Sequence, residues 1–165
     1  RRYGVRCILD CAQTGGRIPI RMGEWGVDAV AFAGHKGLLG PQGIGGFLIS
    51  PELAAEVRPL LAGGTGSQSH LETMPDFLPD RFEAGTLNLP GIFGLRAALD
   101  YLETAGVDAL RQAAMARTEP LPEGLRGISG VRVLGTPATE GRCSAVSVAF
   151  PHPDNPQAAL ELARR

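Results

Sequence analysis

Three short apolar runs near the start of the chain limit its fold more than any other feature. They are Val5–Asp10, Asp28–Phe32 and Gly45–Ser50, and the segments between them are rich in Gly, Pro and Gln. Short apolar runs bounded by turn residues are typical of buried strands. The pattern therefore predicts an α/β unit whose first strand ends at the carboxylate of Asp10.

The rest of the chain alternates between helical and extended patterns. We expect Pro51–Leu61 to be helical, with Pro51 in the first turn, and Gly63–Arg81 to form a long loop. The other predicted elements are helices over Gly91–Ala105, Asp108–Arg117 and Pro156–Arg165, and strands over Val131–Leu134 and Ser144–Phe150. Pro120 and Pro122 should break the extension of the second of these helices beyond Arg117, since each costs about 3 kcal/mol in a helix interior.

The pattern changes from buried α/β to a more open α+β arrangement after about Gly106. We therefore expect two domains, residues 1–106 and residues 107–165. The chain opens at Arg1 almost directly into an apolar run, and a domain rarely begins so abruptly. This suggests further sequence upstream.

Composition excludes several classes of partner. The 165 residues have a net charge of -1, so they show no electrostatic footprint for nucleic acid or an anionic membrane. No apolar run approaches the roughly 20 residues that a membrane span needs. Three cysteines, Cys7, Cys11 and Cys143, fit neither a metal site nor a disulfide framework. We expect a cytoplasmic protein with reduced, mostly buried thiols.

Several familiar ligand motifs can be ruled out. Lys36 lies in a glycine-rich setting, but His35 precedes it and Gly37 follows it, so the phosphate-loop pattern fails. The glycines after Gly43 do not complete a dinucleotide fingerprint, and those after Gly64 do not form a nucleophile elbow. The histidines, His35, His70 and His152, are widely scattered. We therefore expect no metal site.

A set of polar residues follows the first two predicted strands. Asp10 and Gln13 occur in D-C-A-Q, and His35 and Lys36 occur in A-F-A-G-H-K-G. Ligands of open α/β sheets bind at the carboxyl ends of strands, so both segments should reach the same rim. A lysine can form a Schiff base with a carbonyl cofactor, and a carboxylate can pair with a pyridinium nitrogen. The residues alone leave alternatives open that need no cofactor: Asp10 could cap a helix, and Lys36 could simply be solvated.

Three segments, taken in order, resemble the cysteine desulfurase branch of the class V aminotransferases. They are D-C-A-Q-T-G-G-R-I-P-I, V-D-A-V-A-F-A-G-H-K-G-L-L-G-P-Q-G-I-G-G and R-F-E-A-G-T-L-N-L-P-G-I-F-G-L. The resemblance implies a pyridoxal 5'-phosphate (PLP) enzyme of α/β class, transferase fold type I, aspartate-aminotransferase-like. It also implies that residues 1–106 are the C-terminal half of the large PLP-binding domain with its linking helix. Residues 107–165 would be an incomplete α+β small domain.

The resemblance also implies roles for individual residues. Lys36 would be the catalytic lysine that carries PLP, Asp10 would pair with the ring nitrogen, Gln13 would contact the ring hydroxyl and His35 the phosphate. Thr86 would reach the phosphate of the neighbouring subunit's cofactor, which implies a homodimer. Thr86 could instead be a simple turn hydroxyl.

The chain departs from the family pattern in specific ways. The family usually has Ser or Thr three residues before the lysine, and this position is Ala33. A charge-assisted hydrogen bond of roughly 1.5–3 kcal/mol would be missing. The family's nucleophilic cysteine and substrate-binding arginine lie beyond this chain, and Cys143 does not match that cysteine's position.

The implied reaction removes sulfur from L-cysteine, a small amino-acid substrate, and gives L-alanine and a persulfide for a sulfur-acceptor protein. Another class V enzyme, such as a selenocysteine lyase or an aminotransferase, would share every motif quoted above. A truncated, non-catalytic chain is a further alternative, supported by Ala33, Pro120 and Pro122. We expect the 165 residues alone to bind the cofactor weakly and to show no turnover.

Overall fold

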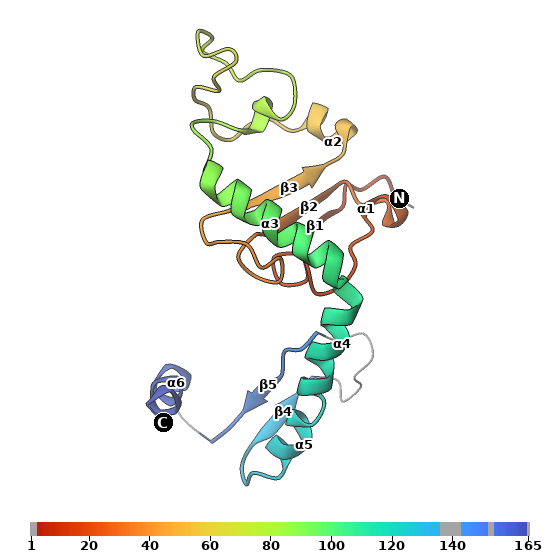
Figure 1. Cartoon of the computed structure of the whole chain (residues 1–165), viewed down its shortest axis with the longest axis vertical. Coiled ribbons are helices and arrows are strands. Elements are labelled where there is room, and N and C mark those ends of the chain that lie inside the picture. Colours follow the sequence, from red (N-terminus) through yellow and green to blue (C-terminus); the bar gives the residue numbers. More distant parts are fainter. Residues whose placement is uncertain (1–2, 136–142, 152–153, 165) are drawn as a thin grey trace. The chain divides into compact units, whose positions relative to one another are not determined.

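The computed structural model describes residues 3–135, 143–151 and 154–164 (Figure 1). The chain divides into two units, Arg1–Asp108 and Ala109–Arg165. Among the described residues, the first unit holds a three-stranded sheet and the second a two-stranded sheet. The predicted cofactor-site residues all belong to the first unit.

The sheet of the first unit consists of the three predicted strands. They are β1 (Ile8–Asp10), β2 (Ala29–Ala33) and β3 (Gly45–Ile49), and they lie in the order β1-β2-β3. β1 is parallel to β2, with Asp10 opposite Ala31, whereas β3 is antiparallel to β2. Because β1 and β2 run in the same direction, the loops that follow them leave from the same edge of the sheet.

The connection from β1 to β2 contains one short helix, α1 (Met22–Trp25), which ends at Gly26 in the left-handed conformation. The small core beside the sheet contains Cys11, Val27 and Val30, against which Leu9, Ile20 and Met22 pack. This connection therefore covers part of the sheet without a long crossover helix.

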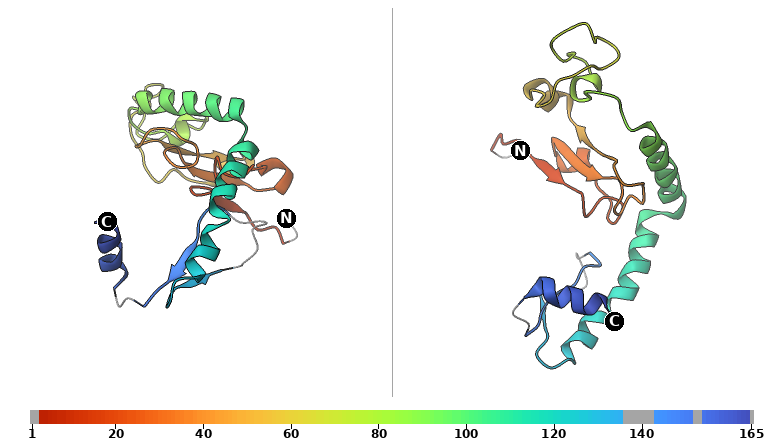
Figure 2. Two further views of the ribbon diagram at one scale, coloured as in Figure 1. Left: turned by 60° about the horizontal axis from the view of Figure 1, so that its bottom comes forward. Right: turned by 90° about the vertical axis from the view of Figure 1, so that its left-hand side faces the viewer.

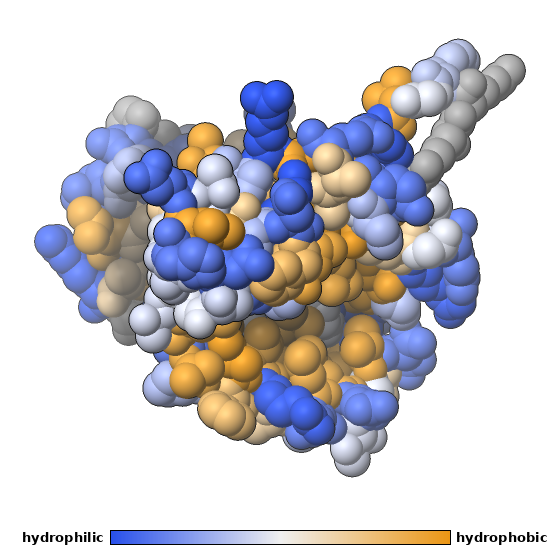
Figure 3. All heavy atoms as spheres, turned by 90° about the horizontal axis from the view of Figure 1, so that it is seen from above, coloured by the Kyte–Doolittle hydropathy of each residue, from blue (hydrophilic) through white to orange (hydrophobic). Residues whose placement is uncertain are grey.

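The expectation that all three strands are buried was wrong. Only β2 begins with buried residues, while Ile8 of β1 is 63% exposed and Leu48 of β3 is 58% exposed. Among the residues that the structure describes, β1 and β3 are the edge strands of the sheet, and each pairs with a strand on one side only. Large apolar side chains thus remain at the surface, where Figure 3 shows apolar residues in orange.

The helix after β3 is shorter than predicted. α2 covers Pro51–Glu56, with Ser50 as its N-cap, whose hydroxyl accepts a hydrogen bond from the backbone N–H of Leu53 at 3.2 Å. Val57 is extended. Pro59 explains the early end, because proline disfavours the helical conformation at the preceding residue and cannot donate a backbone hydrogen bond.

The predicted long loop is present between α2 and the next long helix, and it contains one 3-10 turn, η1 (Asp80–Phe82). The helix α3 then covers Leu89–Ala105 and ends at Gly106, as predicted. It begins two residues earlier than expected because Asn88 caps it and Pro90 fits its first turn. α3 runs across one face of the sheet (Figure 1, Figure 2).

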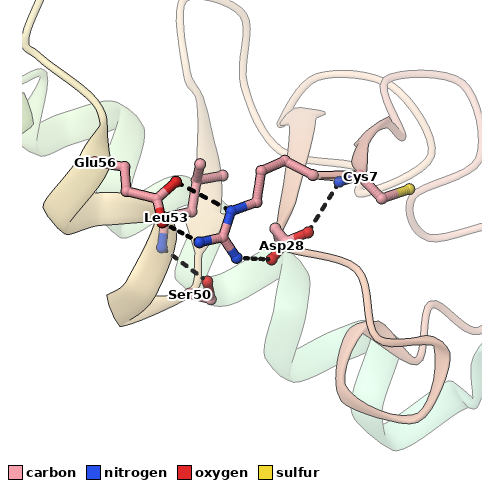
Figure 4. A network of polar contacts seen from close by, with 6 residues as sticks. Cys7, Asp28, Ser50, Leu53 and Glu56 are labelled. Carbon is pink, nitrogen blue, oxygen red and sulfur yellow. Dashed lines mark hydrogen bonds and ion pairs between the residues drawn. The ribbon is translucent and has the colours of Figure 1, made fainter. Parts of the chain in front are cut away.

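An ion network joins Asp28, the residue before β2, to α2. Arg6 donates a hydrogen bond to Oδ1 of Asp28 at 3.0 Å and two to the carboxylate of Glu56. The backbone N–H of Cys7 donates to Oδ2 of Asp28 at 2.9 Å, and Figure 4 shows Cys7 and Asp28 meeting in this way. Hydrogen bonds to Glu56 and Asp28 raise the pKa of Arg6 above its ordinary value. The network therefore attaches the segment before β1 to both later elements.

The second unit is an α+β arrangement. Its described elements are α4 (Val107–Thr118), α5 (Leu121–Arg126), β4 (Arg132–Leu134), β5 (Ser147–Ala149) and α6 (Asn155–Ala163). β4 and β5 pair antiparallel, with Val133 opposite Val148. The predicted break at the two prolines is confirmed: α4 ends before Pro120, and Pro122 lies in the first turn of α5, where its missing N–H costs nothing.

The cysteines are less buried than expected. Cys11 is buried, but Cys7 is exposed and Cys143 is half-buried, so the expectation of mostly buried thiols was wrong. Cys7 is exposed because it precedes the edge strand β1. Within the part of the chain that the structure describes, no helix is long and apolar enough to cross a membrane.

Candidate functional site

The loops that follow β1 and β2 touch through their backbones. A Cβ atom added at Gly37 would overlap the carbonyl oxygen of Gly15, and one added at Gly16 would overlap the carbonyl oxygen of Gly37. Gly16 also has a positive φ of 74°. Side chains larger than hydrogen cannot fit at such a contact, so this close approach requires glycine on both loops. The contact brings the D-C-A-Q loop against the G-H-K-G loop.

Asp10 is the last residue of β1, at the carboxyl end of the strand, where these loops begin. Its Oδ1 accepts a hydrogen bond from the backbone N–H of Ala12 at 2.8 Å, which holds the carboxylate above the first turn of the loop. The following residue, Cys11, donates its backbone N–H to the carbonyl of Ala31 in β2 at 2.8 Å. Asp10 and Gln13 are both exposed. They are therefore accessible to a ligand at this edge.

Lys36 lies on a tight loop that begins where β2 ends. The backbone N–H of Gly34 donates to the carbonyl of Ile44 at 2.9 Å, and that of Gly40 donates to the carbonyl of Gly34 at 2.8 Å. Within this closed loop, the N–H of Leu39 donates to the carbonyl of Lys36 at 2.9 Å. Hydrogen bonds on both sides of Lys36 therefore define its backbone position. Its side chain is half-buried and that of His35 is exposed.

One residue of the Lys36 loop has an unusual backbone conformation. Leu39 has a φ of 61°, in the left-handed region that costs a residue with a side chain roughly 1–2 kcal/mol. Such strain persists only where the surroundings impose it, and it is frequent at functional sites.

Thr86 lies on a different segment, just before α3. The backbone N–H of the preceding residue, Gly85, donates a hydrogen bond to the carbonyl of Gly64 at 2.7 Å. This bond attaches the Thr86 segment to the start of the long loop. Thr86 itself is exposed. Asp10, Gln13, His35 and Lys36 thus lie at or just after the carboxyl ends of β1 and β2, on the same end of the sheet. Thr86, by contrast, lies on the segment just before α3.

The remaining sequence candidates lie elsewhere. Ala33 is the last residue of β2, opposite Gly45, and His70 is exposed in the long loop. His152 lies outside the described residues. Across residues 3–135, 143–151 and 154–164, no group of three or more His, Cys, Asp or Glu side chains is placed to hold a metal ion.

Sequence reasoning missed the glycines at the loop contact and Asn88. The G-G pair after Gln13 was a usable signal, since adjacent glycines allow close backbone approach. Asn88 was also detectable, because an Asn followed by proline in the first turn is an N-terminal helix signal. Its second contact, to Gly43, joins residues far apart in the sequence and had no local signal.

An apolar hollow of about 470 Å³ lies beside this site, between the sheet and α3. Phe32 and Leu48 line it from the strands, and Leu99 and Leu102 line it from the helix. Because its walls are apolar, it does not suit a charged cofactor. The edge with Asp10 and Lys36 does, since it offers a carboxylate, an amide, an imidazole and an amine, the groups that a phosphorylated pyridine aldehyde needs.

Ligands of open α/β sheets bind at the carboxyl ends of the strands, and this sheet has a carboxylate and a lysine loop at the carboxyl ends of two adjacent parallel strands. The model of the family "Aminotransferase class-V" matches residues 1–165. The chain belongs to this family.

Individual relatives show similarity to one group of enzymes, the cysteine desulfurases. The chain is 36% identical over 137 residues to the "Probable cysteine desulfurase" of Methanothermobacter thermautotrophicus, a match that covers 81% of this chain and 34% of the relative. The structure of this chain is similar to that of the apo cysteine desulfurase from Thermococcus onnurineus NA1, with a TM-score of 0.80 and 29% identity. This match covers 99% of this chain and 41% of the other.

A mutant of C-DES, whose structure has glycine covalently linked to the PLP cofactor, gives a TM-score of 0.71 at 27% identity. That match covers 92% of this chain and 40% of C-DES. The fold is therefore that of the PLP-dependent, fold type I enzymes, and the chain spans about a third to two fifths of the length of these relatives.

Proposed function

We propose that this chain is the cofactor-lysine part of a PLP-dependent cysteine desulfurase, which converts L-cysteine to L-alanine and transfers the sulfur as a persulfide. The observation that carries the proposal is the contact of Gly15 and Gly16 with Gly37. This contact supports the proposal because it joins the loop that follows Asp10 and holds Gln13 to the loop that holds Lys36. The similarity to proteins named as cysteine desulfurases supports the choice of reaction.

Each residue of the edge then has a role. PLP, when bound, would supply an electron sink for the substrate. Lys36 would hold the cofactor through its side-chain amine and would move protons as general base and acid. Asp10 would keep the ring nitrogen protonated, Gln13 would donate to the ring oxygen and His35 would donate to the phosphate.

The proposal extends to the assembly. The unit Arg1–Asp108 supplies the later part of the PLP-binding domain and the unit Ala109–Arg165 supplies part of a smaller domain. Thr86 contacts the phosphate in the partner subunit of a homodimer. The enzyme acts in the cytoplasm and passes its sulfur to an acceptor protein.

Two alternatives use the same residues. A selenocysteine lyase or an aminotransferase would need the same lysine and carboxylate but would release no sulfide from L-cysteine. A truncated, non-catalytic chain would keep the fold without holding the cofactor.

Borohydride reduction tests the proposal, because Lys36 is the only lysine in the sequence. After incubation of the protein with PLP and reduction, we expect the cofactor on the peptide that contains Gly34–Gly37. The Lys36→Ala variant serves as control and should lose the visible band and the label. Label confined to the N-terminal amine, or equal labelling of the control, would reject Lys36 as the cofactor lysine.

A further inference from the structure

The side chain of Asn88 connects two segments of the candidate site. Its Nδ2 donates a hydrogen bond to the carbonyl oxygen of Gly43 at 3.1 Å, and its Oδ1 accepts one from the backbone N–H of Gly91 at 3.1 Å. The second bond caps α3, which a carboxylate or hydroxyl would do equally well. The first bond needs an N–H donor, so the amide has a task besides capping.

The loop that carries Lys36 is also packed against the first half of α3. A Cβ atom at Gly40 would lie 2.9 Å from Cδ1 of Leu95, and one at Gly94 would lie 2.8 Å from Cγ of Pro41. A glycine on each side makes room for a side chain of the other: Leu95 of α3 packs against Gly40, and Pro41 of the loop packs against Gly94. The loop and the helix are therefore closely packed near Gly43.

The hydrogen bond to Gly43 is close, along the backbone, to the lysine. Gly43 adjoins Ile44, whose carbonyl accepts the N–H of Gly34, and Lys36 follows two residues later. Asn88 itself follows Thr86 by two residues. One amide side chain therefore links the loop of Lys36 with the segment of Thr86.

We propose that Asn88 is a positioning residue of the cofactor site, which sets the Lys36 loop against the Thr86 segment through its bond to Gly43. This inference rests on the proposed function, since it assumes that both segments contact PLP. Asn88 acts through Gly43 and does not itself touch the cofactor.

The Asn88→Asp variant separates capping from positioning. Aspartate is as good an N-cap as asparagine and suits the positive end of a helix, so α3 should keep its cap. It cannot donate to Gly43, and its carboxylate faces that carbonyl. Asn88→Ala loses both contacts. Asp154→Asn is a matched control, because it makes the reverse exchange at the N-cap of α6 in the other unit.

Two measurements are made on each variant: hydrogen exchange of the Gly34 and Gly40 amides without cofactor, and retention of PLP trapped on Lys36. We expect Asn88→Asp to exchange these amides about two- to tenfold faster and to bind PLP about two- to tenfold more weakly, as expected for the loss of one solvent-exposed hydrogen bond. Its thermal unfolding midpoint should stay close to that of the native protein, and Asp154→Asn should change neither measurement.

Three outcomes would overturn the proposal. Native exchange rates in Asn88→Asp would mean that Asn88 only caps the helix. Faster exchange with native PLP retention would mean that the loop position does not matter to the cofactor. If native protein traps no PLP on Lys36, the proposed function is rejected, and the role of Asn88 at the cofactor site with it. The exchange rates of the Gly34 and Gly40 amides distinguish this outcome from the one in which Asn88 only caps the helix.

Discussion

Arg6 donates a hydrogen bond to the fully buried carboxylate of Asp28 at 3.0 Å and also binds Glu56, which is exposed. The two partners of one guanidinium thus lie in different environments. A charge with no access to water depends on its ion pair far more than an exposed charge does.

We therefore expect Arg6→Ala to destabilise the fold more than Glu56→Ala does, because Asp28 would remain buried after losing a charged partner. Glu56→Ala should cost less than about 1 kcal/mol, since that pair is solvated. Denaturant unfolding of the two variants measures the difference. Equal losses would show that the buried pair is no more important than the exposed one.

The contribution of Arg6 should not depend on pH between 6 and 9. Hydrogen bonds to Glu56 and Asp28 raise the pKa of Arg6 in the folded state. A group with a raised pKa contributes fully below its unfolded pKa and loses its contribution only as the pH rises through the folded pKa. Both values lie above this window. Unfolding of native protein and Arg6→Ala at both pH values should give the same difference, and a difference that shrinks by pH 9 would contradict the assignment.

Gly16→Ala should be more damaging than an alanine at another glycine with positive φ. Gly26 is the matched control, because its φ is 65° and no atom lies within 4 Å of an added Cβ. Gly26→Ala should cost about 1–2 kcal/mol from backbone strain alone. Gly16→Ala adds an overlap with Gly37 and should also reduce trapping of PLP on Lys36. Thermal unfolding and borohydride labelling compare the variants, and similar behaviour of both would mean that the loop contact is not required.

Ala33→Ser should strengthen cofactor binding. The residue ends β2, three positions before Lys36, where the family usually has a hydroxyl. A new charge-assisted hydrogen bond of roughly 1.5–3 kcal/mol would tighten PLP binding about tenfold or more. Ala33→Val is the control, since it adds volume without a hydroxyl. A titration of visible absorbance with PLP gives both affinities, and equal affinities would place the phosphate elsewhere.

The 165 residues by themselves should release no sulfide from L-cysteine. The proposed reaction needs a nucleophilic cysteine and a substrate-binding arginine that the resemblance places beyond this chain. A methylene-blue assay on the purified chain with PLP, L-cysteine and a thiol reductant that releases persulfide sulfur as sulfide checks this. Sulfide release lost in Lys36→Ala would show that this portion is sufficient for turnover.

Local sequence determined much of this protein. Apolar runs between turn residues predicted three strands, and Pro120 with Pro122 predicted the break between α4 and α5. These features depend on neighbouring residues, whose conformational preferences act without the rest of the fold. The expected end of α2 was wrong because the effect of Pro59 was overlooked, although that signal too was local.

Tertiary structure decided the contacts that join the parts of the candidate site. The sequence predicted that the loops after β1 and β2 reach the same end of the sheet, and the parallel pairing of the two strands agrees with this. The glycine contacts that hold the two loops together come only from the packing of the folded chain. The same long-range arrangement makes β1 and β3 edge strands, which is why they are exposed despite their apolar residues. Asn88 reaches Gly43 across 45 positions of sequence, a contact set by where α3 packs and not by the residues beside Asn88.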